Sequence, residues 1–168
     1  MTLKYKSSLS IITFGPLTNI AIAFHYEYKV KNIGAISLLG GQYTGVGNVI
    51  GEYSAEANFH HDPHATHIII HNFSNNVYIT PIERVLEIDW KNKLREIENH
   101  ISLNEKKKAL LKHVNRYTLV CLGPLLTIFP IIIRKTLRKF YEVYSEICMD
   151  GNMIQGLLVI NWFRVDVK

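Results

Sequence analysis

Apolar residues in the first half of the chain gather in three short runs, each ended by glycine or proline. The runs are Leu9–Phe14, Ile33–Leu39 and Val77–Thr80, followed by Gly15-Pro16, Gly40-Gly41 and Pro81 respectively. Short, partly β-branched apolar runs are typical of strands that are covered on both faces in a parallel sheet. The pattern therefore predicts three buried parallel strands.

Helices are predicted between these strands. Thr18 or Asn19 can cap a helix that extends to about Tyr28, because a side-chain oxygen at the cap accepts from free backbone N–H groups. Asp62-Pro63 has the residue types of a cap and a first helical position, and opens a helix to about His71. A strand, a helix and a strand in this order form a βαβ unit. We expect an α/β fold: a fragment of an open, mostly parallel Rossmann-like sheet with flanking helices and a helical second half.

The pattern changes after the third strand. Residues 89–114 are charged and carry apolar side chains at helical intervals, which predicts one or two amphipathic helices. Lys135–Met149 is expected to be helical too, because Leu137, Phe140 and Tyr144 fall near one helix face. We predict an α/β core segment over residues 1–83 and a mainly helical remainder of the same domain over residues 84–168. Three strands make a thin core for a buried sheet, so we expect a further sheet partner.

The uncharged stretch Tyr117–Ile133 is the candidate for a membrane span. It is shorter than the ~20 residues that a span needs, and Gly123-Pro124 and Pro130 interrupt it. A buried helix and turn, or a strand, is favoured, and no membrane association is expected. The two cysteines form no disulfide framework and the N-terminus does not resemble a signal peptide, which favours a cytoplasmic protein.

The net charge of +5 lies entirely in the second half, around residues 106–108 and 134–139. Such clusters can bind phosphate backbones. A stacking surface for nucleic acid would interleave aromatic residues with the basic ones, and these clusters do not. Solvated helix surfaces are therefore favoured, and nucleic acid is an unlikely partner.

Histidines crowd the segment around Asp62: His60, His61, His64, His67 and His71. Spacings of three and four place some of them on one helix face, where two or three could bind zinc or nickel. Their spacing matches no zinc-enzyme signature, and no neighbouring carboxylate is placed as a general base. A polar helix surface is the favoured interpretation. Walker loops, Cys-x-x-Cys pairs and nucleophile elbows are absent from the sequence.

Asn48, Glu56 and Asn58 lie on or beside the glycine-rich segment that follows the second predicted strand. In open α/β sheets ligands bind at the carboxyl ends of the strands. Amides and carboxylates suit sugar hydroxyls, because they donate and accept in fixed directions. Taken alone, these residues are interpreted as surface loop residues, since such residues are common in turns.

Several motifs in order resemble the inosine-uridine preferring nucleoside hydrolases. They are Gly15-Pro16-Leu17-Thr18-Asn19, Leu39-Gly40-Gly41, Val46-Gly47-Asn48, Ala55-Glu56-Ala57-Asn58-Phe59 and Asp62-Pro63. The resemblance runs from about residue 9 to residue 80. It implies hydrolysis of the N-glycosidic bond of purine or pyrimidine ribonucleosides to ribose and free base, with calcium holding the ribose diol and a water.

The resemblance also implies roles for particular residues. Asn48, Glu56 and Asn58 would contact ribose hydroxyls, and Phe14 would lend its backbone carbonyl to calcium. Asp150 is the nearest candidate for the family's later calcium aspartate, although Asp150-Gly151 is also typical of a simple turn. Asp62 is expected only to cap its helix.

The family's N-terminal aspartate cluster has no counterpart, since the first aspartate in the chain is Asp62. We therefore expect an incomplete calcium site, and little or no activity from this chain by itself. The alternative is a non-catalytic member of the family that binds ribosides or a partner protein through the same loop. A ribonucleoside is the expected ligand, and a homo-oligomer stays open.

Overall fold

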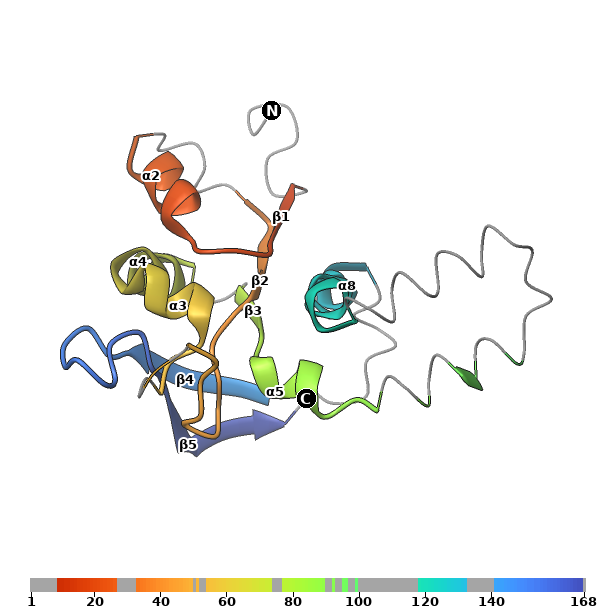
Figure 1. Ribbon diagram of the computed structural model, residues 1–168. Helices are drawn as coiled ribbons and strands as arrows, with labels where there is room; N and C mark the ends of the chain where they lie inside the picture. The colour runs from red at the N-terminus through yellow and green to blue at the C-terminus, as the bar shows by residue number, and fades with distance from the viewer. Residues whose placement is uncertain are drawn as a thin grey trace.

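The computed structural model describes residues 9–26, 33–49, 51, 54–73, 77–89, 92, 95–96, 99, 118–132 and 141–167. Three strands, β1 (Ser10–Thr13), β2 (Ala35–Leu39) and β3 (Val77–Thr80), form a parallel sheet in the order β1-β2-β3 (Figure 1). In the central strand, Ile36 pairs with Ile11 on one side and Val77 on the other. The three predicted strands and their parallel direction are confirmed.

Helices cover both faces of this sheet. α2 (Thr18–Tyr26) and α4 (Pro63–Asn72) lie on one face, and α8 (Thr118–Ile132) lies on the other (Figure 1). Two single-turn helices, α3 (Ala57–His61) and α5 (Ile82–Leu86), follow β2 and β3. The predicted helices after the first strand and after Asp62 are both confirmed. The predicted amphipathic helices of residues 89–114 lie almost wholly outside the described residues.

Asp62 ties the start of α4 to the start of α2. Its Oδ1 atom accepts a hydrogen bond from the backbone N–H of Ala65 at 2.9 Å, and its Oδ2 atom accepts from the Thr18 hydroxyl. Pro63 occupies the first helical position, where its missing N–H costs nothing. The prediction that Asp62 caps its helix is confirmed.

The core lies between the sheet and the α2–α4 layer. Its largest fully buried apolar side chains come from the loop before α2, the central strand and α3–α4: Leu17, Ile36, Leu38, Phe59 and Ile69. Apolar side chains from the far end of the chain, at Ile147 and Leu158, complete the same cluster. Burial of this continuous cluster joins the two halves of the chain.

Helix α8 approaches the opposite face of β2 closely. A Cβ atom on Gly123 would lie 2.7 Å from the end of the Leu39 side chain, so a larger residue there would require that side chain to shift. The Ser37 hydroxyl donates to the backbone carbonyl of Thr127 at 2.5 Å. Of the two structures predicted for this apolar stretch, the helix is confirmed where the structure describes it, and the helix continues through Pro124. None of the helices within the described ranges is long and apolar enough to cross a membrane.

The predicted helix over residues 135–149 is wrong where the structure describes it. Residues Tyr141–Ile147 form strand β4, which pairs antiparallel with β5 (Leu158–Val167). Val143, Ser145 and Ile147 are buried or half-buried, and the residues of β4 pair one to one with those of β5 from Tyr144 to Ile147. Tyr144, which helical spacing placed on an apolar face, is 53% exposed. The division at residue 84 stays a prediction, but its second part contains this hairpin as well as a helix.

Candidate functional site

Glu56 holds together the loop that follows β2. Its Oε2 atom accepts from the backbone N–H groups of Gly41 at 3.0 Å, Asn58 at 3.1 Å and Phe59 at 3.3 Å. Its own backbone N–H donates to the Gln42 side-chain carbonyl at 3.1 Å. Only 4% of the surface of Glu56 is exposed. The same side chain therefore both caps α3 and fixes the backbone at Gly41, where the loop begins.

The charge state of Glu56 is set by opposing effects. Burial raises the pKa of its carboxyl, because loss of water disfavours the charged form. The three backbone N–H donors act in the opposite direction, since they stabilise the carboxylate. Its Oε1 atom has no hydrogen-bond partner within the described ranges. One oxygen is thus fixed by the protein, and the other remains able to bind a ligand hydroxyl.

Asn48 and Asn58 lie beside Glu56, around the start of α3. The Asn48 Oδ1 atom accepts from the backbone N–H of Ala57 at 2.8 Å. The Asn58 amide nitrogen donates to the carbonyl of Leu39, the last residue of β2, at 2.9 Å. The remaining amide atoms, Nδ2 of Asn48 and Oδ1 of Asn58, have no partner among the residues described. The structure therefore brings the three predicted sugar-contacting residues together at the carboxyl end of the central strand.

A second buried carboxylate, which sequence reasoning missed, holds the other part of this loop. Glu83, at the start of α5, accepts through Oε1 from the N–H groups of Tyr43 at 2.7 Å and Thr44 at 2.8 Å, and from the Thr44 hydroxyl at 2.8 Å. The Tyr43 hydroxyl donates to Glu87, which raises the pKa of Tyr43 to about 12. Nothing in the local sequence around Glu83 signals this role, because its partners are about 40 residues away.

The two residues assigned to calcium by the resemblance, Phe14 and Asp150, lie on different segments of the fold. Phe14 follows β1, and its side chain is 46% exposed. Asp150 is exposed in the irregular segment between β4 and β5, where its backbone carbonyl accepts from the Cys148 thiol at 3.3 Å. Calcium takes six to eight oxygen ligands, whereas the group of potential ligands that the described residues bring together contains two histidines and lies elsewhere. Asp150 belongs to no group of three such side chains within the described ranges, and both calcium assignments stay predictions from the resemblance.

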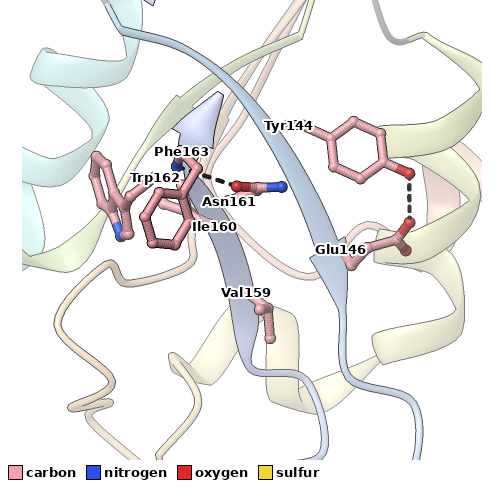
Figure 2. Close-up of a pocket in the computed structure, with 7 residues that line it drawn as sticks. All are labelled: Tyr144, Glu146, Val159, Ile160, Asn161, Trp162 and Phe163. Atoms are coloured by element: carbon pink, nitrogen blue, oxygen red, sulfur yellow. Dashed lines mark hydrogen bonds between the residues drawn. The ribbon is translucent and has the colours of Figure 1, made fainter. Parts of the chain in front are cut away.

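A hollow of about 490 Å³ lies against the β4–β5 hairpin (Figure 2). Tyr144, Val159, Trp162 and Phe163 give it a mainly apolar lining. None of the three predicted sugar-contacting residues lines it. This hollow is therefore a separate feature from the loop at the carboxyl end of β2.

The arrangement of sheet and helices matches solved nucleoside hydrolases. An inosine-uridine preferring nucleoside hydrolase from Bacillus anthracis superimposes with a TM-score of 0.74 at 21% identity, over 95% of this chain and 54% of that one. A plant nucleoside hydrolase, PpNRh1, gives a TM-score of 0.72 at 23% identity, over 95% of this chain and 52% of that one. These likenesses establish the fold, and the chain spans about half the length of either structure.

Sequence comparison identifies the family. A family model for inosine-uridine preferring nucleoside hydrolases matches residues 1–162. The chain therefore belongs to the inosine-uridine preferring nucleoside hydrolase family. Probable uridine nucleosidase 2 of Arabidopsis thaliana is 40% identical over 62 residues, 36% of this chain and 19% of that protein. Its counterpart in Oryza sativa subsp. japonica is 33% identical over 96 residues, 54% of this chain and 27% of that protein.

Proposed function

We propose that this chain carries the ribose-binding loop of a nucleoside hydrolase that cleaves the N-glycosidic bond of purine or pyrimidine ribonucleosides to ribose and free base. The observation that supports it is the anchoring of Glu56, whose Oε2 atom takes three backbone N–H groups while Oε1 is left for a ligand. Asn48 and Asn58 each keep one amide atom for the same purpose. A donor, an acceptor and a carboxylate oxygen in one loop suit the adjacent hydroxyls of ribose.

We further propose that the chain by itself binds ribosides and turns them over slowly or not at all. In the family's chemistry, as the resemblance implies it, calcium supplies charge stabilisation and a bound water. The one group of three His, Cys, Asp or Glu side chains that the described residues bring together contains two histidines, which suit calcium poorly, so we expect little charge stabilisation of the reaction from these residues. Glu56 and its neighbours then serve to bind and orient the sugar.

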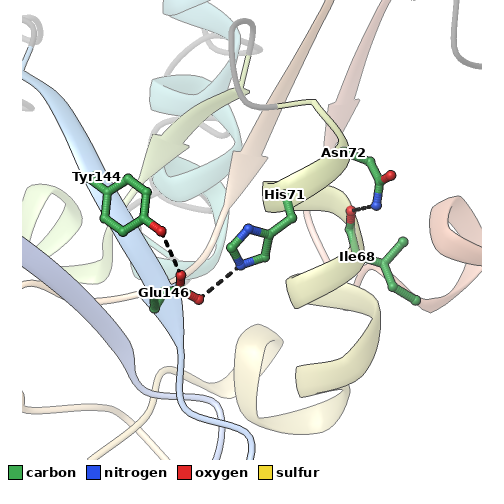
Figure 3. A network of polar contacts seen from close by, with 5 residues as sticks. All are labelled: Ile68, His71, Asn72, Tyr144 and Glu146. Carbon is green, nitrogen blue, oxygen red and sulfur yellow. Dashed lines mark hydrogen bonds and ion pairs between the residues drawn. The ribbon is translucent and has the colours of Figure 1, made fainter.

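Binding is tested by calorimetry with inosine, uridine and free ribose on the wild type and two variants. Asn58→Ala should weaken riboside binding about tenfold, the effect of one lost hydrogen bond of roughly 1.4 kcal/mol. Asn72→Ala is the matched control, because the Asn72 amide also donates to a backbone carbonyl, that of Ile68 at 2.7 Å, but on the exposed end of α4 (Figure 3). It should leave affinity unchanged.

Three results would contradict the proposal. Absence of riboside binding by the wild type removes the ribose-binding role. Equal losses in Asn58→Ala and Asn72→Ala show that the loop amide has no special contact with the sugar. Rapid release of base from inosine or uridine, measured by chromatography together with tight stoichiometric calcium binding, overturns the expectation of low activity.

A non-catalytic riboside-binding or protein-binding role is the second candidate. It is favoured by the same anchored loop, since sugar contacts survive without a metal site. The two candidates separate when turnover is measured beside binding. A non-catalytic protein shows a change of affinity in Asn58→Ala with no turnover to lose, under any supply of calcium.

A further inference from the structure

His67 and His71 of α4 meet Glu146 of β4 on a surface away from the ribose-binding loop. One potential ligand atom from each of the three residues lies within 4.8 Å of the other two. The closest pair is His71 Nε2 and Glu146 Oε2, 2.9 Å apart (Figure 3). Residues 75 positions apart in the sequence are thus brought to one point by the docking of the hairpin on α4.

The two histidines are well oriented to share an ion. They are four residues apart on one helix, so their side chains point to the same side, and their ring centroids are 4.1 Å apart. The Nδ1 atom of His67 is buried and has no hydrogen-bond partner in the described part of the chain. A buried polar atom without a partner is costly, and a metal ion or its bound water can satisfy it.

Glu146 is held in position by a further contact. Its Oε1 atom accepts from the Tyr144 hydroxyl at 3.0 Å, while Oε2 faces His71 (Figure 3). The Tyr144 hydroxyl therefore fixes the carboxylate from its far side. Metal-binding carboxylates commonly carry such a supporting hydrogen bond.

We propose that His67, His71 and Glu146 form a binding site for a borderline divalent transition-metal ion such as Zn²⁺. Two imidazoles and one carboxylate are a ligand set that zinc uses, and three protein ligands leave a fourth position for water. Tetrahedral zinc with bonds of about 2.0–2.2 Å needs ligand atoms about 3.3 Å apart. Side-chain torsions of the half-exposed His67 and the exposed His71 can supply the small adjustment that this requires.

This site is separate from the family's calcium chemistry. Calcium prefers oxygen ligands, whereas two of these three ligands are nitrogens. His71 lies nine residues after Asp62, so it is about 13 Å along α4 from the helix end that adjoins the loop. The bound ion would cross-link α4 to β4 and stabilise the docked hairpin. The inference does not depend on the proposed nucleoside chemistry, and its test uses no nucleoside.

The experiment is a Zn²⁺ titration of the full chain, freed of metal by a chelator that is then removed, in a non-coordinating buffer at pH 7.5. Wild type should bind one ion per chain with a rise in melting temperature, and Ca²⁺ should give no rise. His67→Ala, His71→Ala and the near-isosteric Glu146→Gln should each weaken Zn²⁺ binding at least tenfold. His64→Ala removes an exposed histidine of the same helix outside the cluster and should change affinity less than twofold.

A second readout guards against variants that lose binding because they are misfolded. Co²⁺ in a tetrahedral nitrogen–oxygen site absorbs visible light, and this absorption should appear with wild type and His64→Ala only. Circular dichroism should show that all four variants keep the wild-type spectrum. Equal Zn²⁺ affinity in wild type and in a His67→Ala/His71→Ala double variant would overturn the proposal. So would an equal loss in His64→Ala, which would indicate diffuse binding to surface histidines.

Discussion

At the scale of single residues, carboxylates determine the shape of the candidate site. Glu56 satisfies three backbone N–H groups, and Glu83 satisfies two more together with a hydroxyl. Both residues are less than a tenth exposed. A loop rich in glycine gains its fixed geometry from these acceptors, because glycine itself restricts the backbone so little.

Removal of the Glu56 side chain should therefore lower the stability of the protein substantially. Glu56→Ala leaves three N–H groups without their acceptor and should lower the free energy of unfolding by about 2–3 kcal/mol, measured by urea denaturation. Asp150→Ala is the control, since the Asp150 side chain is exposed and makes no hydrogen bond within the described part. It should change stability by less than about 0.5 kcal/mol. Similar effects of the two substitutions would show that Glu56 is not the anchor.

The same variant has a defined pH dependence. Because burial raises the Glu56 pKa in the folded state, folding takes up a proton in the range above the unfolded value of 4.5. The stabilising contribution is fully present below that value and is lost as pH rises through the raised folded pKa. The difference in unfolding free energy between wild type and Glu56→Ala should thus be larger at pH 4 than at pH 8. A larger difference at pH 8 would indicate a carboxylate stabilised more by its N–H donors than it is destabilised by burial.

At the scale of elements, a helix start that depends on adjacent residues could be predicted from the sequence, whereas the pairing of strands distant in the sequence could not. The Asp62-Pro63 start of α4 follows from two adjacent residues, so the sequence predicts it correctly. The β4–β5 hairpin was missed, because Tyr144 falls at a helical spacing by coincidence and the partner strand lies beyond a ten-residue connection. The metal cluster was missed for the same reason: the histidines were noted, but Glu146 reaches them only through that hairpin.

A close contact between two parts of the proposed ribose-binding loop provides a test at this scale. A Cβ atom on Gly47 would lie 1.8 Å from the backbone carbonyl oxygen of Ala55, and backbone cannot swing aside as a side chain does. Gly47→Ala should force these segments apart, lower stability by at least about 1 kcal/mol and weaken riboside binding. Gly15→Ala is the matched control, because a Cβ atom there meets nothing within 4 Å. Binding that survives Gly47→Ala unchanged would place the sugar elsewhere.

At the scale of the whole molecule, the described parts share one core although they come from both halves of the sequence. The hairpin contributes Ile147 and Leu158 to the cluster that surrounds β2, and α8 covers the other face of that strand. Each layer buries a face of the same three-strand sheet (Figure 1). A single folding unit is expected from this arrangement, because neither half retains a covered sheet without the other.

A substitution at Ser37 can test whether the two halves of the sequence unfold together. The fully buried Ser37 hydroxyl donates to the Thr127 carbonyl, so Ser37→Ala removes a buried hydrogen bond between the halves and should cost about 0.5–1.5 kcal/mol. Both tryptophans, Trp90 and Trp162, lie in the second half of the sequence. If the halves unfold together, Ser37→Ala lowers the urea midpoint seen by tryptophan fluorescence as much as the midpoint seen by circular dichroism. Ser10→Ala, on the edge strand of the sheet, is the control and should shift neither midpoint. If Ser37→Ala leaves the fluorescence midpoint unchanged, the two halves of the chain unfold as separate units.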